Sequence, residues 1–174
     1  MPARIRQAWR GVALVSTLVL AAGGCGYSVR GQLPSHIKTV GVPILVNRTS
    51  EPAVEGLLTR AIVEAFSTNG KLTVVRPEDA DSILEGEVIG YTIDSIAFDP
   101  RANVRQYRLT VTLNLRFRDV RRNTVLFEQA NFQERSDFQV LSAVAETISR
   151  EESALRLAAV DIARTVVNLA VERF

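Results

Sequence analysis

The stretch YRLTVTLNLRFR, residues 107–118, alternates between polar and apolar side chains without a break. Successive side chains of a β-strand point to opposite faces of the sheet, so the alternation predicts a strand with one apolar and one polar face. The apolar face must be covered by a hydrophobic core, whereas the polar face is bracketed by arginines. The residues expected on the covered face are Tyr107, Leu109, Val111, Leu113, Leu115 and Phe117.

Other predicted strands extend a sheet around this one. The phase of the apolar residues changes within 83–98, and a bulge or bend between Gly86 and Gly90 would account for the change. Turn-forming residues at 99–103 and 121–123 separate successive strands of a meander. Besides 107–118, the predicted strands are 37–46, which is apolar on both faces and suits a central position, 71–76, 83–98 and 124–134.

Two segments have the apolar spacing of amphipathic helices. The first covers residues 54–66, with Ser50 as a candidate N-cap and Pro52 in the first turn. Gly70 is expected to end this helix. The second segment, 141–174, also has a helical pattern and forms either one helix or two.

The order of these elements predicts an α+β fold. The first strand–helix–strand unit would pair its strands in parallel through a right-handed crossover, and the remaining strands would form the meander. We therefore expect a two-layer sandwich, with two main helices packed on one face of a mixed four- to five-stranded sheet. The polar face of 107–118 would stay uncovered. Residues 37–174 are expected to form this single domain.

Residues 1–24 have the features of an export signal. Three arginines precede an apolar run of 12 residues at 11–22. A membrane-spanning helix needs about 20 apolar residues. Removal of the signal would leave 18 basic and 19 acidic residues, a net charge of −1 with histidine neutral. The basic isoelectric point of the full chain is therefore no indication of a nucleic-acid partner, and none is expected.

Cys25, the only cysteine, follows this apolar run and a group of small residues. The position fits the site at which bacterial lipoproteins take a diacylglycerol, and a buried structural cysteine is the alternative. A lipid anchor would hold the domain to one membrane face without spanning it. Residues 25–36 would then be the lipidated N-terminus and tether. Ala22 replaces the usual leucine of the lipidation motif, which leaves the efficiency of processing open.

The sequence contains no convincing catalytic set. Its only histidine, His36, lies in the tether, where we expect a solvated loop residue rather than a base. One cysteine and one histidine cannot form a Cys/His metal cluster, and no phosphate-binding loop is present. We therefore expect no enzymatic activity, no metal and no cofactor.

Arginine dominates the basic residues, since only Lys38 and Lys71 are lysines. Guanidinium groups bind phosphate in a bidentate manner, so the arginines of the central hairpin could bind an anionic lipid head group. The alternative is a solvated sheet face whose charges prevent edge-to-edge pairing. These arginines are Arg101, Arg105, Arg108, Arg116, Arg118, Arg121 and Arg122.

Four segments together resemble the lipopolysaccharide-assembly lipoprotein family LptE. They are CGYSVRG (25–31), LPSHIKTVGVPILVNRTSEPAVEGLLTRAI (33–62), ADSILEGEVIGY (80–91) and YRLTVTLNLRFRDV (107–120). The resemblance implies two helices on a four-stranded sheet and a lipid anchor in the outer membrane, on its periplasmic face. It further implies a plug in the lumen of the LptD β-barrel that assists assembly of the barrel and contacts lipopolysaccharide. Gly26 fits sorting to the outer membrane.

The resemblance also implies roles for particular residues. Arg101 and Arg105 match the basic hairpin positions suspected of contacting lipopolysaccharide in the family, and Arg108 lies next to them. Asp137 and Glu146 stand where the family's more distal basic surface lies, so a second basic contact is not matched. A plug in a polar lumen should present a hydrophilic face to its barrel. On the strand 107–118 this face consists of Thr110, Thr112, Asn114, Arg116 and Arg118.

An alternative function is that of a lipoprotein that activates a peptidoglycan synthase, whose domain has a similar strand–helix start and an Asn-Arg-Thr loop like 47–49. Such activators carry a long disordered tether behind the cysteine. Here the tether of about a dozen residues spans only about 40 Å at full extension. The short tether favours a role close to the membrane.

Overall fold

The computed structural model describes residues 33–140 and 144–172, so the predicted signal, Cys25 and the segment 141–143 lie outside the described residues. The elements in chain order are β1 (Thr39–Gly41), β2 (Val46–Asn47), α2 (Val54–Asn69), β3 (Thr73–Val75), the short 3₁₀ helix η2 (Pro77–Asp79), β4 (Ser82–Phe98), β5 (Val104–Asp119), β6 (Thr124–Gln139) and α3 (Val144–Glu172).

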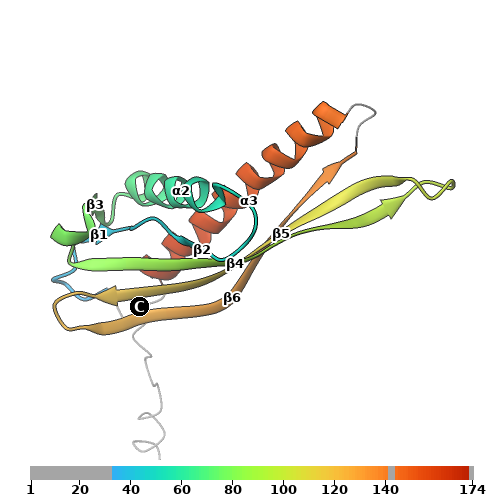
Figure 1. The fold of residues 1–174 in the computed structure, drawn as a ribbon. Helices are drawn as coiled ribbons and strands as arrows, with labels where there is room; N and C mark the ends of the chain where they lie inside the picture. The colour runs from blue at the N-terminus through green and yellow to red at the C-terminus, as the bar shows by residue number, and fades with distance from the viewer. Residues whose placement is uncertain (1–32, 141–143, 173–174) are drawn as a thin grey trace, which may run out of the picture. The chain divides into compact units, whose positions relative to one another are not determined.

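The strands form one mixed sheet in the order β3-β1-β4-β5-β6, with β2 also paired to β4. β1 pairs with β3 in parallel, as expected for a strand–helix–strand unit, whereas β4, β5 and β6 form an antiparallel meander. Both helices lie on the same side of the sheet (Figure 1). The predicted α+β two-layer fold is confirmed, with six strands in the described part of the chain.

The covered face of β5 is the centre of the hydrophobic core. Of the six residues predicted on this face, five are buried and Tyr107 is half-buried. Four side chains of α2 cover it together with a face of α3 in which alanine recurs, and small residues allow the helices to approach closely. The buried residues of the two helices include Val54, Leu58, Ile62, Phe66, Ala154, Ala158, Ala159, Ile162, Ala163, Val166, Val167 and Ala170.

The predicted strand 37–46 is in fact two short strands. β1 and β2 both pair with β4 in parallel, and Pro43 lies in the segment between them. Proline has no N–H to donate to a ladder, which explains the break. The expectation of one central strand was therefore wrong in length, although β1 does lie inside the sheet.

The predicted N-cap and first turn of the first helix were wrong, although the predicted range 54–66 lies within α2. The helix begins after Ala53, whose backbone is left-handed (φ 63°) and which provides no side-chain cap. Neither Ser50 nor Pro52 belongs to the helix. The predicted end is confirmed, because Gly70 is left-handed (φ 71°) and its N–H donates to the carbonyl of Phe66.

Asn47 organises the loop that leads into α2. Its Nδ2 donates to the carbonyl of Glu51 (2.7 Å) and to Oε2 of Glu55 (2.9 Å). Its Oδ1 accepts hydrogen bonds from the N–H and the hydroxyl of Thr49, both at 2.8 Å. These contacts give the Asn-Arg-Thr motif a structural role inside the loop.

The sheet is irregular where two bulges adjoin the middle of β5. The register of β4 shifts between Val88 and Gly90, which confirms the predicted bulge. On the other side of β5, the pairing with β6 shifts its register at Asn114. The Oδ1 of Asn114 accepts a hydrogen bond from the N–H of Asn131 (3.0 Å), a residue with a positive φ of 52°. Bulges bend a sheet and increase its twist.

The C-terminal segment forms one helix, α3, rather than two. Its first half is tied to the sheet by Tyr91, whose hydroxyl donates to Oε1 of Glu151 at 2.9 Å. Burial and this hydrogen bond raise the pKa of Tyr91 above its ordinary value. Beyond this contact, most side chains of Glu146–Arg150 are exposed, so the helix end lies away from the core.

Candidate lipid- and partner-contacting surface

The hairpin tip, residues 99–103, is organised by Asp99. Its Oδ1 accepts the N–H groups of Arg101 (2.8 Å) and Asn103 (2.9 Å), and its Oδ2 accepts from Arg105 (3.1 Å). Hydrogen bonds from Asn103 hold the pKa of Asp99 below its ordinary value. Ala102 adopts the left-handed conformation (φ 63°) that closes the turn. The tip therefore has a defined backbone conformation that presents the arginines.

The three arginines predicted to contact lipid differ in their availability. Arg101 is exposed and makes no side-chain ion pair within the described part of the chain. Arg105 is 65% exposed and uses one nitrogen for Asp99. Both Nε and a terminal nitrogen of Arg108 are occupied by Asp137, at 2.7 and 2.9 Å. The structure thus leaves Arg101 and Arg105 open to a ligand and engages Arg108 in a bidentate pair.

Apolar side chains are exposed on the last part of β4, next to the tip. Ile93, Ile96 and Phe98 are 38, 36 and 59% exposed. Exposed residues of this size normally lie in interaction surfaces when several are grouped together. The end of the hairpin therefore combines the exposed guanidinium groups of Arg101 and Arg105 with apolar surface, as an amphiphilic ligand requires.

The polar face of β5 is not covered by either helix, and its charges are balanced across the sheet. Arg116 pairs with Glu128 of β6 (3.2 Å), and Arg118 pairs with Glu85 of β4 (3.1 Å). Glu128 lies directly opposite Arg116 in the ladder register, and Glu85 lies close to the position opposite Arg118, so both acids share the face. The face is therefore hydrophilic but not basic. Thr110, Thr112 and Asn114 lie on the same face between Arg108 and Arg116 and are partly exposed.

A shallow hollow of about 590 Å³ crosses this face near the bulges. Its polar lining includes Glu87, Asn114 and Arg116, and its rim carries Ile44 and Val46. Ile44 is the more exposed of the two rim residues, at 73%. The uncovered face thus offers a concave contact area that combines charged and amide groups with apolar surface.

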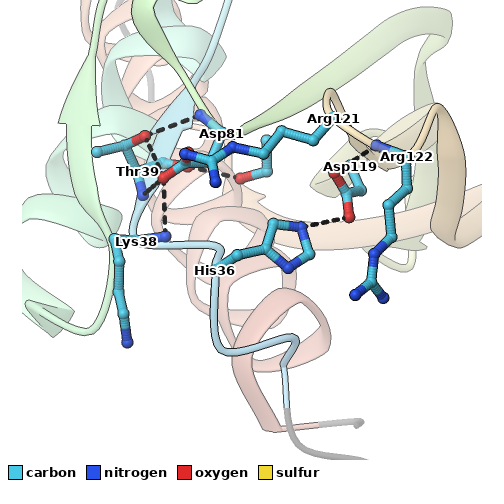
Figure 2. A network of polar contacts seen from close by, with 8 residues as sticks. His36, Lys38, Thr39, Asp81, Asp119, Arg121 and Arg122 are labelled. Atoms are coloured by element: carbon cyan, nitrogen blue, oxygen red, sulfur yellow. Dashed lines mark hydrogen bonds and ion pairs between the residues drawn. The ribbon is translucent and has the colours of Figure 1, made fainter.

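His36 is not the solvated loop residue expected from the sequence. Its Nε2 lies 2.7 Å from Oδ2 of Asp119, a carboxylate with no exposed surface, and its own side chain is 19% exposed (Figure 2). Burial acts to raise the pKa of Asp119, but hydrogen bonds from the N–H of Arg122 and from His36 outweigh it, so the pKa is lowered. Sequence reasoning missed this contact because the partners are 83 residues apart.

A second carboxylate, Asp81, lies at the same end of the domain and accepts hydrogen bonds from the chain just after His36. Its Oδ2 accepts the N–H groups of Lys38 (3.1 Å) and Thr39 (3.2 Å), and its Oδ1 pairs with Arg121 (3.0 Å). The hydrogen bond from Lys38 is the main reason why the pKa of Asp81 is lowered. We call His36, Thr39, Asp81, Ser82 and Asp119 the root cluster, because it lies where the predicted tether joins the domain.

Within residues 33–140 and 144–172, no three His, Cys, Asp or Glu side chains are grouped so that they could bind a metal ion. No helix in these ranges combines the length and apolar character needed to cross a membrane. The fold and surface define a two-layer α+β domain with one uncovered polar sheet face and a projecting hairpin. The chain belongs to the LptE lipopolysaccharide-assembly family, whose model matches residues 37–169.

Solved structures share this fold at low sequence identity. Protein XCC0632 of Xanthomonas campestris matches with a TM-score of 0.55 at 17% identity, covering 79% of this chain and 89% of that one. An uncharacterized lipoprotein B of Nitrosomonas europaea matches with 0.51 at 18%, covering 82% and 91%. The hypothetical protein CT253 of Chlamydia trachomatis matches with 0.53 at 10%, covering 75% and 94%. No curated protein sequence matches the chain.

Proposed function

We propose that this protein is an outer-membrane lipoprotein, acylated at Cys25, that plugs an LptD-type β-barrel, assists its assembly and contacts lipopolysaccharide. Membership of a lipopolysaccharide-assembly family supports the general role. The observation that carries the lipid contact is the exposed Arg101, which has no ion-pair partner among the described residues and stands beside the half-engaged Arg105. No catalytic step is part of this role.

The uncovered sheet face supports the contact with the barrel. The lumen of a large β-barrel is polar, so a plug should present hydrophilic groups to it and keep its own apolar side chains under the helices. The ion pairs of Arg116 and Arg118 keep this face hydrophilic without a large net charge. We assign the barrel contact to this face, formed on β5 by Thr110, Thr112, Asn114, Arg116 and Arg118.

The lipid contact is tested by reversing the two available charges. Arg101→Glu combined with Arg105→Glu should weaken lipopolysaccharide binding by the purified protein about tenfold or more, because two phosphate contacts become repulsive. Isothermal titration or binding to immobilised lipopolysaccharide measures the loss. Arg108→Gln should have a smaller effect, since Asp137 already occupies that guanidinium.

A matched control keeps the change in net charge equal. Arg60 is exposed and, like Arg101, has no ion pair with a residue that the structure describes. Arg156 is 64% exposed and donates one nitrogen to Glu152 at 3.1 Å, which closely matches Arg105. Arg60→Glu combined with Arg156→Glu should therefore leave lipopolysaccharide binding nearly unchanged. Equal losses in both double variants would assign the binding to general charge and contradict the assignment to the tip.

The barrel contact is tested by co-purification. The tagged, acylated protein, recovered from detergent-solubilised outer membrane, should bring with it one large β-barrel protein, identified by mass spectrometry. The interaction should withstand high salt, because the ion pairs of the uncovered face are satisfied within the domain and the contact does not depend on long-range charge. Recovery of a peptidoglycan synthase in place of a barrel would support the alternative function.

A further inference from the structure

The root cluster holds the first described residues of the chain to two distant parts of the fold. His36 contacts Asp119 at the end of β5, and the N–H of Arg122 in the following turn donates to Oδ1 of the same carboxylate (3.1 Å). Asp119 is fully buried, so this contact is shielded from solvent and from salt. A residue near the chain's N-terminal side is thereby joined to the turn between β5 and β6.

The next residues are bound to the start of β4 by reciprocal hydrogen bonds. The hydroxyl of Thr39 donates to Oδ2 of Asp81 (3.0 Å) and accepts the N–H of Asp81 (2.8 Å). The hydroxyl of Ser82, which is fully buried, donates to the carbonyl of Thr39 (2.8 Å). Figure 2 shows these contacts converging on the segment from His36 to Thr39.

Strand pairing holds this segment on its β3 side, where the ladder starts at Thr39 and the N–H of Thr73 donates to the carbonyl of Lys38 (3.0 Å), but only weakly toward β4. β1 has three residues, and its ladder with β4 consists of the pairs Val40–Ser82 and Gly41–Ile83. On the β1 side both pairs begin after Thr39, so the residues from His36 to Thr39 are joined to β4 and β5 mainly by side-chain contacts. Ile37, which is 2% exposed, adds one apolar contact with the core.

The root cluster and the hairpin tip lie at opposite ends of the β4–β5 hairpin. Ser82 begins β4 and Asp119 ends β5, whereas residues 99–103 connect the other ends of the two strands. β4 has 17 residues and β5 has 16. At about 3.3 Å per residue, the hairpin separates the root cluster from the tip by about 50 Å.

We infer that the root cluster is a positioning device, which fixes where the predicted lipid-bearing segment leaves the domain and directs the hairpin tip away from that point. Its functional consequence rests on the proposed acylation of Cys25. If the lipid-bearing segment leaves the domain at a fixed point, the position of the lipid anchor relative to the β4–β5 hairpin is restricted. Residues 25–35 span at most about 40 Å, so a freely swinging attachment would add a large uncertainty to the reach of the tip.

The inference is tested by measuring a distance distribution across the hairpin in the purified mature chain. Cys25→Ser removes the only native thiol, and Ser35→Cys with Pro100→Cys places spin labels on exposed residues beside the root cluster and at the tip. Pulsed electron paramagnetic resonance should show one narrow peak at about 50 Å. In the His36→Ala, Thr39→Ala variant we expect this peak to be lost and replaced by a broad distribution.

Two further variants separate positioning from general stability. The single variant His36→Gln keeps a side-chain donor at this position. Most of the narrow peak should therefore remain in this variant. Arg48→Ala removes a surface ion pair with Glu87 that lies outside the root cluster, and it should leave the peak unchanged. A peak that stays narrow in His36→Ala, Thr39→Ala while the domain remains folded would overturn the inference.

The measurement requires neither acylation nor a barrel nor lipopolysaccharide. A negative result would therefore leave the proposed function in place. Conversely, unchanged lipopolysaccharide binding in the Arg101, Arg105 variant would count against the lipid contact without affecting the root cluster.

Discussion

Replacing Phe117 with alanine is expected to lower the free energy of unfolding by about 4 kcal/mol. Phe117 has no exposed surface, faces Leu84 across the β4–β5 ladder and packs against the ring of Phe127, with ring centroids 5.6 Å apart. Alanine would remove this apolar contact area and leave a cavity that the surrounding strands can only partly fill. Urea unfolding at neutral pH, followed by circular dichroism, measures the change.

The same replacement at an exposed phenylalanine provides the control. Phe98 is 59% exposed near the hairpin tip, so Phe98→Ala should change the free energy of unfolding by no more than about 0.5 kcal/mol. A loss below about 1 kcal/mol for Phe117→Ala would contradict the position of β5 at the centre of the core. Comparable losses in both variants would contradict it as well.

The success of the sequence prediction at β5 has a physical cause. The helices cover one face of β5 along most of its length, so every second residue of this strand must be apolar. The glycine signals were equally informative. Gly70 ends α2, and the shift next to Gly90 accommodates the change of apolar phase in β4.

The errors arose where local sequence rules competed with contacts between distant residues. Ser50 is a good N-cap by type, but the loop contacts of Asn47 place the start of α2 at Val54 instead. The segment 37–46 has the composition of one strand, yet Pro43 interrupts it and two short pairings with β4 replace one long pairing. Helix and strand boundaries depend on such tertiary contacts more than on propensity.

The candidate surface was predictable in composition but not in electrostatics. The alternation places Arg116 and Arg118 on the polar face, whereas their partners Glu128 and Glu85 come from other strands and depend on the register. Likewise, the pairing of Arg108 with Asp137 crosses from β5 to β6. A single sequence does not give this register, so a face that is charge-balanced resembled a basic one.

Replacing Asp119 with asparagine is expected to lower the free energy of unfolding by about 2 kcal/mol at neutral pH. Asparagine keeps the size of the side chain but has no charge and only one acceptor oxygen, whereas the two oxygens of Asp119 accept from His36 and from the N–H of Arg122. Because Asp119 is fully buried, water cannot replace these contacts. Urea unfolding of the two proteins over a series of pH values measures the difference.

The pH dependence of this difference follows from the lowered pKa of Asp119 in the folded state. In the unfolded chain the carboxyl titrates near its ordinary value of 3.8, so the native protein binds fewer protons than the unfolded chain in this region. The stabilisation is complete above the unfolded pKa and is lost as the pH falls through the folded pKa. The two unfolding curves should therefore differ most near neutrality and converge in acid.

The same replacement at an exposed aspartate provides the control for burial. Asp161, 49% exposed, pairs with Arg164 along α3, and Asp161→Asn should change the free energy of unfolding by no more than about 0.5 kcal/mol at any pH. If Asp119→Asn were equally neutral, or if its cost grew as the pH fell, the pair with His36 would not stabilise the folded state. The same pair would then also be too weak to hold the N-terminal segment at the end of β5, because a contact that adds no stability cannot restrict the chain it joins.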